Sequence, residues 1–197
     1  MAAYAMNAKM TALLLCLAAC TPAAPRETPP LAGSSIGGPF ALTDQDGRTV
    51  TDRSFAGQYR IMYFGYTSCP DVCPTDMANV GGGLKLLEQE DPALARRITP
   101  IFVSVDPQRD TPAVLKAFVA NFHPRMVGLT GAPEAIAKVA EEYKVYAERG
   151  KAAPGGGYLV NHTRQTYLLD PTGKPLALLP ADANARAVAD EIKRWAA

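Results

Sequence analysis

The sequence predicts an α/β domain in which helices flank a central mixed sheet and a β-hairpin stands at the N-terminal end. Two segments have the composition of strands that are buried on both faces: residues 60–66, with an unbroken apolar run at 61–66, and residues 98–105. A segment with helical spacing lies between them, and a strand–helix–strand unit of this kind implies parallel pairing. Shorter strand patterns before and after this unit supply the antiparallel strands of a mixed sheet.

The N-terminal hairpin is expected from residues 40–43 and 48–51, because Asp46 and Gly47 between them are typical turn residues. After the run 60–66, an apolar stripe at helical spacing predicts a helix; its members are Met77, Val80, Leu84 and Leu87. The glycines at 81–83 interrupt this stripe, and each interior glycine costs about 1 kcal/mol against alanine. We therefore expect the helix to be kinked or broken.

The second half of the chain continues the alternation of strands and helices. Thr111 suits an N-cap and Pro112 the first position of a helix that follows the run 98–105. The later elements are a short strand at 126–130, a helix lined by Ile136, Val139, Ala140 and Tyr143, a small-residue loop at 151–157, the segment 158–162, strands at 165–169 and 176–179, and a last helix with Val188, Ile192 and Trp195 facing inward. This order of elements is thioredoxin-like.

The start of the chain has the pattern of a lipoprotein signal peptide, residues 1–19. Lys9 precedes an apolar run at 12–19 that is too short to span a membrane. The run leads into Leu-Ala-Ala-Cys at 17–20, which resembles a bacterial lipobox, so we expect cleavage before Cys20 and lipid on its thiol. An ordinary secretory signal with an incidental cysteine is the alternative.

Residues 20–38 are rich in proline, alanine, glycine and serine, and we expect them to form a flexible tether to a domain at 39–197. This organisation predicts a lipid-anchored protein on the periplasmic face of a bacterial membrane. The chain has 197 residues and a formal net charge of +1, a length that suits one domain with a sizeable core. The small net charge and the lack of a basic stripe argue against a nucleic-acid partner. We expect a monomer.

Two of the four cysteines are expected to be free thiols in the mature domain. Cys16 leaves with the signal peptide and Cys20 carries lipid, which leaves Cys69 and Cys73. These two lie where a buried strand is followed by a helix, and the unpaired N–H groups of a helix start favour a thiolate. Cysteines four residues apart lie about 40° apart around a helix. Their Cα atoms would be roughly 6 Å apart, which permits a disulfide. The spacing therefore fits a redox dithiol, half of a copper site, or a structural disulfide between Cys69 and Cys73.

Several motifs in combination resemble the Sco/SenC family, although a CxxxC spacing alone would be a weak signal. The motifs are YTSCPDVCP at 66–74, SVDPQRDTP at 104–112, VGLTG at 127–131, and His162-Thr163 followed by YLLDPTG at 167–173. The resemblance covers residues 39 to about 195. It implies a thioredoxin-fold, membrane-anchored copper protein that serves assembly of the copper A centre of cytochrome c oxidase.

The resemblance also implies a ligand set and partners. The ligands are Cys69, Cys73 and His162, and the metal is copper as Cu(I) or Cu(II). The implied partner is the copper A subunit of the oxidase or another periplasmic copper chaperone. The chemistry of the residues agrees, because Cu(I) is soft and takes two thiolates, while imidazole serves both copper states. Zinc would normally take a fourth ligand.

One position departs from the family pattern. The family commonly has aspartate before the histidine, where this chain has Asn161. A carboxylate there would accept the imidazole N–H and raise its basicity. Asparagine can accept the same hydrogen bond but adds no charge. We therefore expect Asn161 to support His162 without binding the metal, and Cu(II) affinity to be the property that this departure affects.

Other residues are assigned structural roles. His123 is expected at a helix end on the surface and not as a ligand. Asp106 and Asp110 are expected as turn and cap residues, and Arg109 is a minor candidate for a partner contact. The aromatic residues of the first buried run are expected in the core: Tyr63, Phe64 and Tyr66.

Three functions can be compared on this basis. A copper-binding assembly factor agrees with the whole pattern. A thiol-disulfide oxidoreductase that reduces the cysteines of the oxidase copper site needs only Cys69 and Cys73, but generic thioredoxin activity uses a CxxC spacing. A peroxiredoxin-like peroxidase needs a nucleophilic cysteine near an arginine, and the CPDVCP context does not match it. We expect the first function, with no turnover enzyme activity beyond thiol-disulfide exchange.

Overall fold

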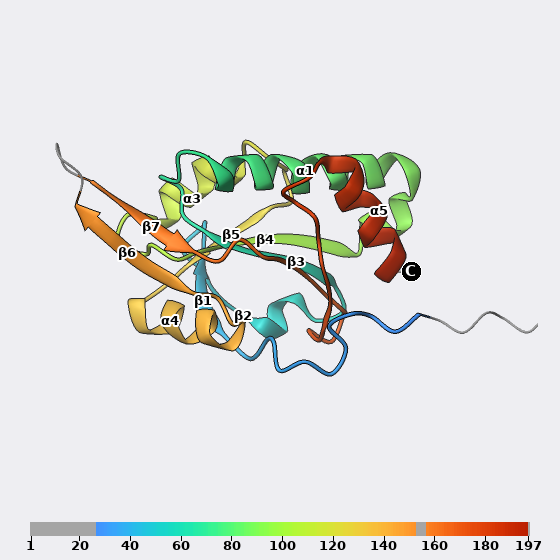
Figure 1. Ribbon diagram of the computed structural model, residues 1–197, viewed down its shortest axis with the longest axis horizontal. Coiled ribbons are helices and arrows are strands. Elements are labelled where there is room, and N and C mark those ends of the chain that lie inside the picture. The colour runs from blue at the N-terminus through green and yellow to red at the C-terminus, as the bar shows by residue number, and fades with distance from the viewer. Residues whose placement is uncertain (1–26, 153–156, 197) are drawn as a thin grey trace, which may run out of the picture.

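A computed structural model of the chain describes residues 27–152 and 157–196 (Figure 1). The strands are β1 (Ala41–Asp44), β2 (Thr49–Thr51), β3 (Tyr59–Gly65), β4 (Ile98–Ser104), β5 (Val127–Thr130), β6 (Ala147–Ala152), β7 (Tyr158–His162), β8 (Thr166–Leu169) and β9 (Pro175–Leu178). The helices are α1 (Val72–Glu90), α2 (Pro92–Ala95), α3 (Pro112–Val119), α4 (Pro133–Glu142) and α5 (Ala185–Trp195), with a 3₁₀ turn η1 (Asp52–Phe55).

The sheet is mixed, as the sequence predicts. Its order is β2-β1-β5-β4-β3-β8-β9, while β6 and β7 form a separate two-stranded ribbon. Strand β3 pairs in parallel with β4 and antiparallel with β8, and all of its residues are buried. Strand β4 pairs in parallel with β5, which confirms the predicted strand–helix–strand unit. The antiparallel β1–β2 hairpin is also confirmed.

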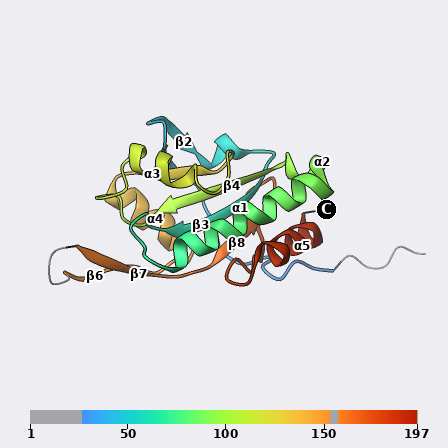
Figure 2. The same cartoon turned by 90° about the horizontal axis from the view of Figure 1, so that it is seen from above.

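Helices cover both faces of this sheet. In Figure 1, α1 and α5 lie above the sheet and α4 lies below it, and Figure 2 shows α1 and α5 side by side. Leu84 of α1, Leu115 of α3 and Ile192 of α5 belong to one apolar core. Phe55 of η1 and Ile136 of α4 belong to the core on the opposite face. The predicted thioredoxin-like arrangement is therefore confirmed.

Helix α1 runs unbroken through the glycines at 81–83, so the predicted kink or break is wrong. A Cβ on Gly81 would lie 2.6 Å from the carbonyl oxygen of Phe122, and a Cβ on Gly83 would lie 2.8 Å from Val188 of α5. The glycines thus permit close approach of two neighbouring segments. Burial of the helix stripe between the sheet and α5 outweighs the local propensity cost.

Strand β6 was not predicted, because residues 151–157 were expected to form a loop. All six of its residues lie outside the core, five of them exposed, so it lacks the alternation that marks a half-buried strand. Its pairing with β7 comes from the backbone, with Ala147 opposite His162 and Glu148 opposite Asn161. The ribbon extends the chain beyond the main sheet and carries the predicted histidine at its base.

The predicted tether is described only from residue 27 onward. Leu31 donates its N–H to the carbonyl oxygen of Leu176 at 3.0 Å, and Gly37 donates to that of Glu142 at 2.9 Å. Leu31 and Ile36 pack against the core on the α4 face.

The predicted signal peptide and Cys16 and Cys20 lie outside the described residues. Within residues 27–152 and 157–196, no helix combines the length and apolar character needed to cross a bilayer.

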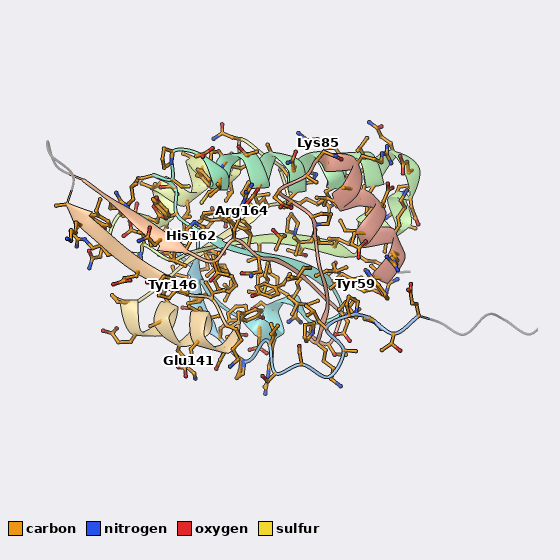
Figure 3. The ribbon with its side chains drawn as sticks, viewed as in Figure 1. Tyr59, Lys85, Glu141, Tyr146, His162 and Arg164 are labelled. Atoms are coloured by element: carbon orange, nitrogen blue, oxygen red, sulfur yellow. The ribbon has the colours of Figure 1, made fainter. Side chains whose placement is uncertain are left out.

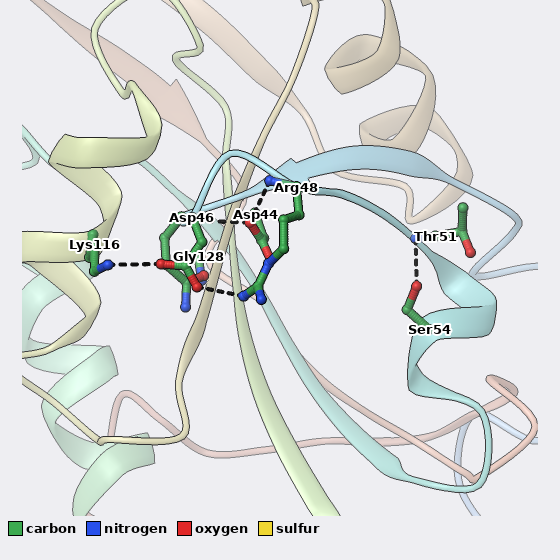
Figure 4. A network of polar contacts seen from close by, with 8 residues as sticks. Asp44, Asp46, Arg48, Thr51, Ser54, Lys116 and Gly128 are labelled. Carbon is green, nitrogen blue, oxygen red and sulfur yellow. Dashed lines mark hydrogen bonds and ion pairs between the residues drawn. The ribbon is translucent and has the colours of Figure 1, made fainter.

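A polar network fixes the turn of the β1–β2 hairpin (Figure 4). Asp44 accepts hydrogen bonds from the N–H groups of Asp46 and Arg48, both at 2.9 Å. Lys116 of α3 pairs with Asp46 at 2.9 Å, and Gly128 of β5 donates its N–H to Gln45 at 2.9 Å. The predicted turn residues therefore also attach the hairpin to the rest of the domain.

Candidate metal centre

The fold brings Cys69, Cys73 and His162 together at the end of the sheet where β3 and β4 finish. Their three possible ligand atoms all lie within 4.8 Å of one another. Cys69 belongs to the loop between β3 and α1, Cys73 to the first turn of α1, and His162 to the last position of β7. The Nε2 atom of His162 lies 3.3 Å from the Sγ atom of Cys73, although 89 positions separate the two residues. Figure 3 labels His162 at the end of β7.

The two thiols have different environments. Both are free, with Cys73 fully buried and Cys69 partly exposed. Burial raises the pKa of Cys73 to about 12, which opposes the expected stabilisation of its thiolate by the helix start. The backbone N–H of Cys73 lies 3.5 Å from the Sγ atom of Cys69, which makes Cys69 the thiol that the helix start contacts. The Cys69–Cys73 disulfide remains a prediction for the oxidised protein.

The imidazole of His162 is oriented by the chain that follows it. Its Nδ1 atom lies 2.9 Å from the carbonyl oxygen of Thr163, an acceptor that places the proton on Nδ1. The Nε2 atom is then an acceptor, which is the form that a metal ligand requires. The rings of Tyr63 and Tyr66 meet the imidazole edge-on, with centroids 6.3 and 5.8 Å away.

Asn161 lies on the other side of the ribbon from His162. Successive residues of a strand point to opposite faces, and Asn161 is exposed whereas His162 is partly buried. The hydrogen bond that we expected from the Asn161 side chain is made instead by the backbone carbonyl of Thr163. In the part of the chain that the structure describes, the Asn161 side chain makes no hydrogen bond to the imidazole.

Asp110 holds the loop that carries Cys69. Its buried carboxylate accepts hydrogen bonds from the N–H of Thr67 at 3.0 Å, from the Thr67 hydroxyl at 2.5 Å and from the Ser104 hydroxyl at 2.6 Å. It therefore joins the end of β4 to the loop before Cys69. The predicted helix cap is Thr111, whose side chain accepts from the N–H of Val114.

Asp106 and Arg109 attach the ribbon to the loop after β4. Arg109 pairs with Asp106 and donates to the carbonyl oxygen of Tyr158 at 3.0 Å. Its guanidinium also stacks on the Tyr158 ring at 3.8 Å, and the Tyr158 hydroxyl donates to Asp106 at 2.7 Å. The side chain of Arg109 is 28% exposed, and a partner contact there stays a prediction.

His123 is buried, so its predicted surface position is wrong. The turn after α3 folds it inward, where its Nδ1 atom accepts the N–H of Arg125 at 3.2 Å and its Nε2 atom lies 3.4 Å from Glu88. Burial lowers the pKa of His123. His123 takes no part in the cluster of Cys69, Cys73 and His162. The predicted core positions of Tyr63, Phe64 and Tyr66 are confirmed.

Two charged residues beside the site were missed from the sequence. Asp76 is fully buried on α1, and Arg164 in the segment after β7 pairs with it. Asp76 carried a signal, because it lies three residues after Cys73 on the apolar face of the helix, where an unpaired carboxylate would be costly. No sequence pattern marks Arg164, because a charged residue in a loop looks exposed and its pairing with Asp76 depends on the tertiary fold.

The fold and the site together define a thioredoxin-like domain with a metal-binding cluster of two thiols and one imidazole. The SCO1/SenC family model matches residues 28–197, and the chain belongs to this family. It is 41% identical over 162 residues to Protein SenC of Rhodobacter capsulatus, covering 82% of this chain and 71% of that protein. The chain spans 46% and 42% of the length of two mitochondrial relatives that it also matches, from Saccharomyces cerevisiae and Arabidopsis thaliana.

Solved structures of the family have the same fold. Copper-bound ScoI of Bradyrhizobium japonicum is 41% identical with a TM-score of 0.73, over 81% of this chain and 99% of that one. BsSco, described as having a disulfide switch and as a member of the Sco family of cytochrome c oxidase assembly proteins, is 28% identical with a TM-score of 0.62, over 81% and 92% of the two chains.

Proposed function

We propose that this domain binds copper through Cys69, Cys73 and His162 and serves assembly of the copper A centre of cytochrome c oxidase. The observation that carries the proposal is the convergence of the two sulfur atoms and the Nε2 atom within 4.8 Å. Two thiolates suit soft Cu(I), and the imidazole adds a ligand that Cu(II) also accepts. Similarity to copper-bound ScoI supports the choice of metal.

The environment of the ligands suits a copper ion that is bound and then transferred. Cys69 is partly exposed while Cys73 is buried, so a metal would arrive and leave on the Cys69 side. When bound, copper would supply a charge that lowers the pKa of the Cys73 thiol and keeps both cysteines from oxidising. His162 already has its Nδ1 atom at a carbonyl, so its Nε2 atom needs no reorientation to bind.

A second function is favoured by one observation. Both thiols are free and close enough for exchange, with the more exposed Cys69 placed to attack a partner disulfide and the buried Cys73 placed to resolve it. Reduction of the cysteines of the oxidase copper site would use this chemistry. It gives no role to His162, which is why we rank it second.

The oxidase test uses a bacterial strain that lacks this gene. Wild-type protein should restore the copper A absorption of purified oxidase, and a Cys69→Ser/Cys73→Ser double variant should not, because it removes both soft ligands. Arg186→Gln, which changes an exposed ion pair between α5 and Glu90, is the matched control and should restore it fully. Normal copper A in the strain that carries the double variant would contradict the proposed function.

The location belongs to the same proposal: a lipid on Cys20 holds the domain at the periplasmic face of a bacterial membrane, where the copper A subunit or a periplasmic copper chaperone is within reach. The Leu-Ala-Ala-Cys sequence at 17–20 supports this. In detergent phase partitioning, wild-type protein should enter the detergent phase and Cys20→Ser should move to the aqueous phase. Equal partitioning of the two proteins would count against a lipid anchor.

A further inference from the structure

Two residues outside the ligand set connect the histidine to the helix that carries the thiols. Arg164 donates from Nε to one carboxylate oxygen of Asp76 at 2.8 Å and from Nη2 to the other at 2.6 Å. The pair is therefore bidentate, the geometry in which arginine and carboxylate bind most strongly and with a fixed orientation. Figure 3 labels Arg164 close to His162.

The carboxylate of Asp76 is held on a third side. The hydroxyl of Tyr63 donates to its Oδ2 atom at 3.0 Å, and the side chain of Asp76 is 1% exposed. Burying a carboxylate is costly unless its oxygen atoms are paired with a charge and hydrogen-bonded, as they are here. Asp76 stands three positions after Cys73 on α1, so the two share one face of the helix. Arg164 is thus attached to the same helix turn that presents the thiol.

Strand β7 is attached to the domain through Tyr158, which contacts Asp106 and Arg109, and through the buried Val160. Among residues 27–152 and 157–196, its backbone pairs only with β6, in the ribbon that stands apart from the seven-stranded sheet. The chain rejoins the sheet at Thr166, which pairs with Tyr63 of β3. Between His162 and Thr166, Thr163 bonds back to Tyr146 at the base of the ribbon. Arg164 is the residue of this connection whose side chain contacts α1.

We propose that the Asp76–Arg164 pair is a positioning device that locks the segment after β7 against α1 and thereby holds the His162 imidazole on the Cys69–Cys73 thiols. This inference rests on the proposed function, since it assigns the pair to the same metal site. Neither residue binds the metal. The pair acts by restricting where the imidazole can lie, so its loss weakens binding that depends on nitrogen and spares binding that depends on the two sulfurs.

The test compares Arg164→Gln, Arg164→Lys and Arg186→Gln in the full-length protein, titrated with Cu(II) and with Cu(I) under anaerobic conditions. Residues that orient metal ligands typically change affinity by about 10–100-fold when altered, and we expect a Cu(II) loss in this range for Arg164→Gln. Lysine keeps the charge but cannot make two parallel bonds, so Arg164→Lys should show a smaller loss. Cu(I) affinity should change little. Arg186 of α5 pairs with Glu90 at the opposite end of α1, and Arg186→Gln should match the wild type.

A double-mutant cycle separates positioning from a general loss of structure. In a His162→Ala background, Arg164→Gln should cause no further loss of Cu(II) affinity, because it acts through the missing imidazole. The same loss in both backgrounds would overturn the proposal. If Arg164→Gln does not fold, Arg164→Lys carries the cycle.

A readout without metal distinguishes this inference from the proposed function. In the metal-free, reduced protein, the ring nitrogen signals of His162 should be sharp in the wild type and in Arg186→Gln and exchange-broadened in Arg164→Gln. Unchanged ring signals in Arg164→Gln would overturn the positioning role even if copper binds normally. Broadened signals in a protein that binds no copper would support the positioning role and reject the proposed function alone.

Discussion

Replacing His162 by alanine should abolish oxidase assembly while leaving the chemistry of the two thiols intact. The substitution removes the Nε2 atom that lies 3.3 Å from Cys73 and leaves both sulfur atoms in place. Cu(I) accepts coordination by two thiolates, so it should still bind with reduced affinity, whereas Cu(II) prefers nitrogen ligands and should bind far more weakly. The dithiol should oxidise and reduce as before, because its spacing and its position at the start of α1 do not change.

The measurement is paired. Cu(II) absorption of the purified protein gives metal binding, and the dithiol reduction potential together with oxidase activity in cells gives the two candidate functions. The matched control is His123→Ala, which removes the other histidine of the chain and lies outside the cluster. Full oxidase assembly with His162→Ala would mean that copper coordination is not the working function, and the reductase function would replace it.

Gly81→Ala should destabilise the domain even though alanine favours a helix. A Cβ at this position would lie 2.6 Å from the carbonyl oxygen of Phe122 and 3.0 Å from its carbonyl carbon, and backbone atoms cannot yield cheaply. Overpacking of this kind costs about 1–3 kcal/mol, and the gain in helix propensity returns up to about 1 kcal/mol. We expect a net loss of up to about 2 kcal/mol in the free energy of unfolding, measured by urea denaturation.

Ala78→Gly in the same helix is the control for helix propensity. Ala78 is exposed, so the change should lower stability by about 1 kcal/mol through backbone entropy alone. Opposite substitutions in one helix should therefore both destabilise. An increase in stability for Gly81→Ala would show that α1 and the turn after α3 are not closely packed at this point.

This glycine run shows where sequence reasoning about the fold fails. The apolar stripe through Met77, Val80, Leu84 and Leu87 correctly predicts the buried face of α1. Propensity wrongly predicts a break, because the reason for the glycines is a neighbour that is distant in sequence. The sequence does not predict strand β6 for a related reason. An exposed ribbon has no burial pattern, so the pairing of β6 with β7 leaves no periodic signal in the sequence.

For the metal cluster, the sequence predicts the ligand residues but not the contacts that hold them in place. Cys69 and Cys73 stand out locally, and His162 follows from the resemblance of several motifs taken together. The structure adds what holds them: Asp110 on the loop before Cys69, Thr163 on the imidazole, and the buried Asp76 beside Cys73. These contacts join segments that lie far apart in the chain, so no local sequence pattern predicts them.

One copper ion is expected to bind to the two sulfurs and one imidazole nitrogen. The direct measurement is an anaerobic copper titration of the reduced protein, with Cys16 and Cys20 replaced by serine so that only Cys69 and Cys73 remain. Thiol reactivity is counted at each step, and the ligands are identified by X-ray absorption at the copper edge. We predict that one equivalent of Cu(I) protects both thiols from alkylation and that the absorption spectrum reports two sulfur ligands and one nitrogen ligand. Thiols that stay fully reactive beside excess copper would contradict the account.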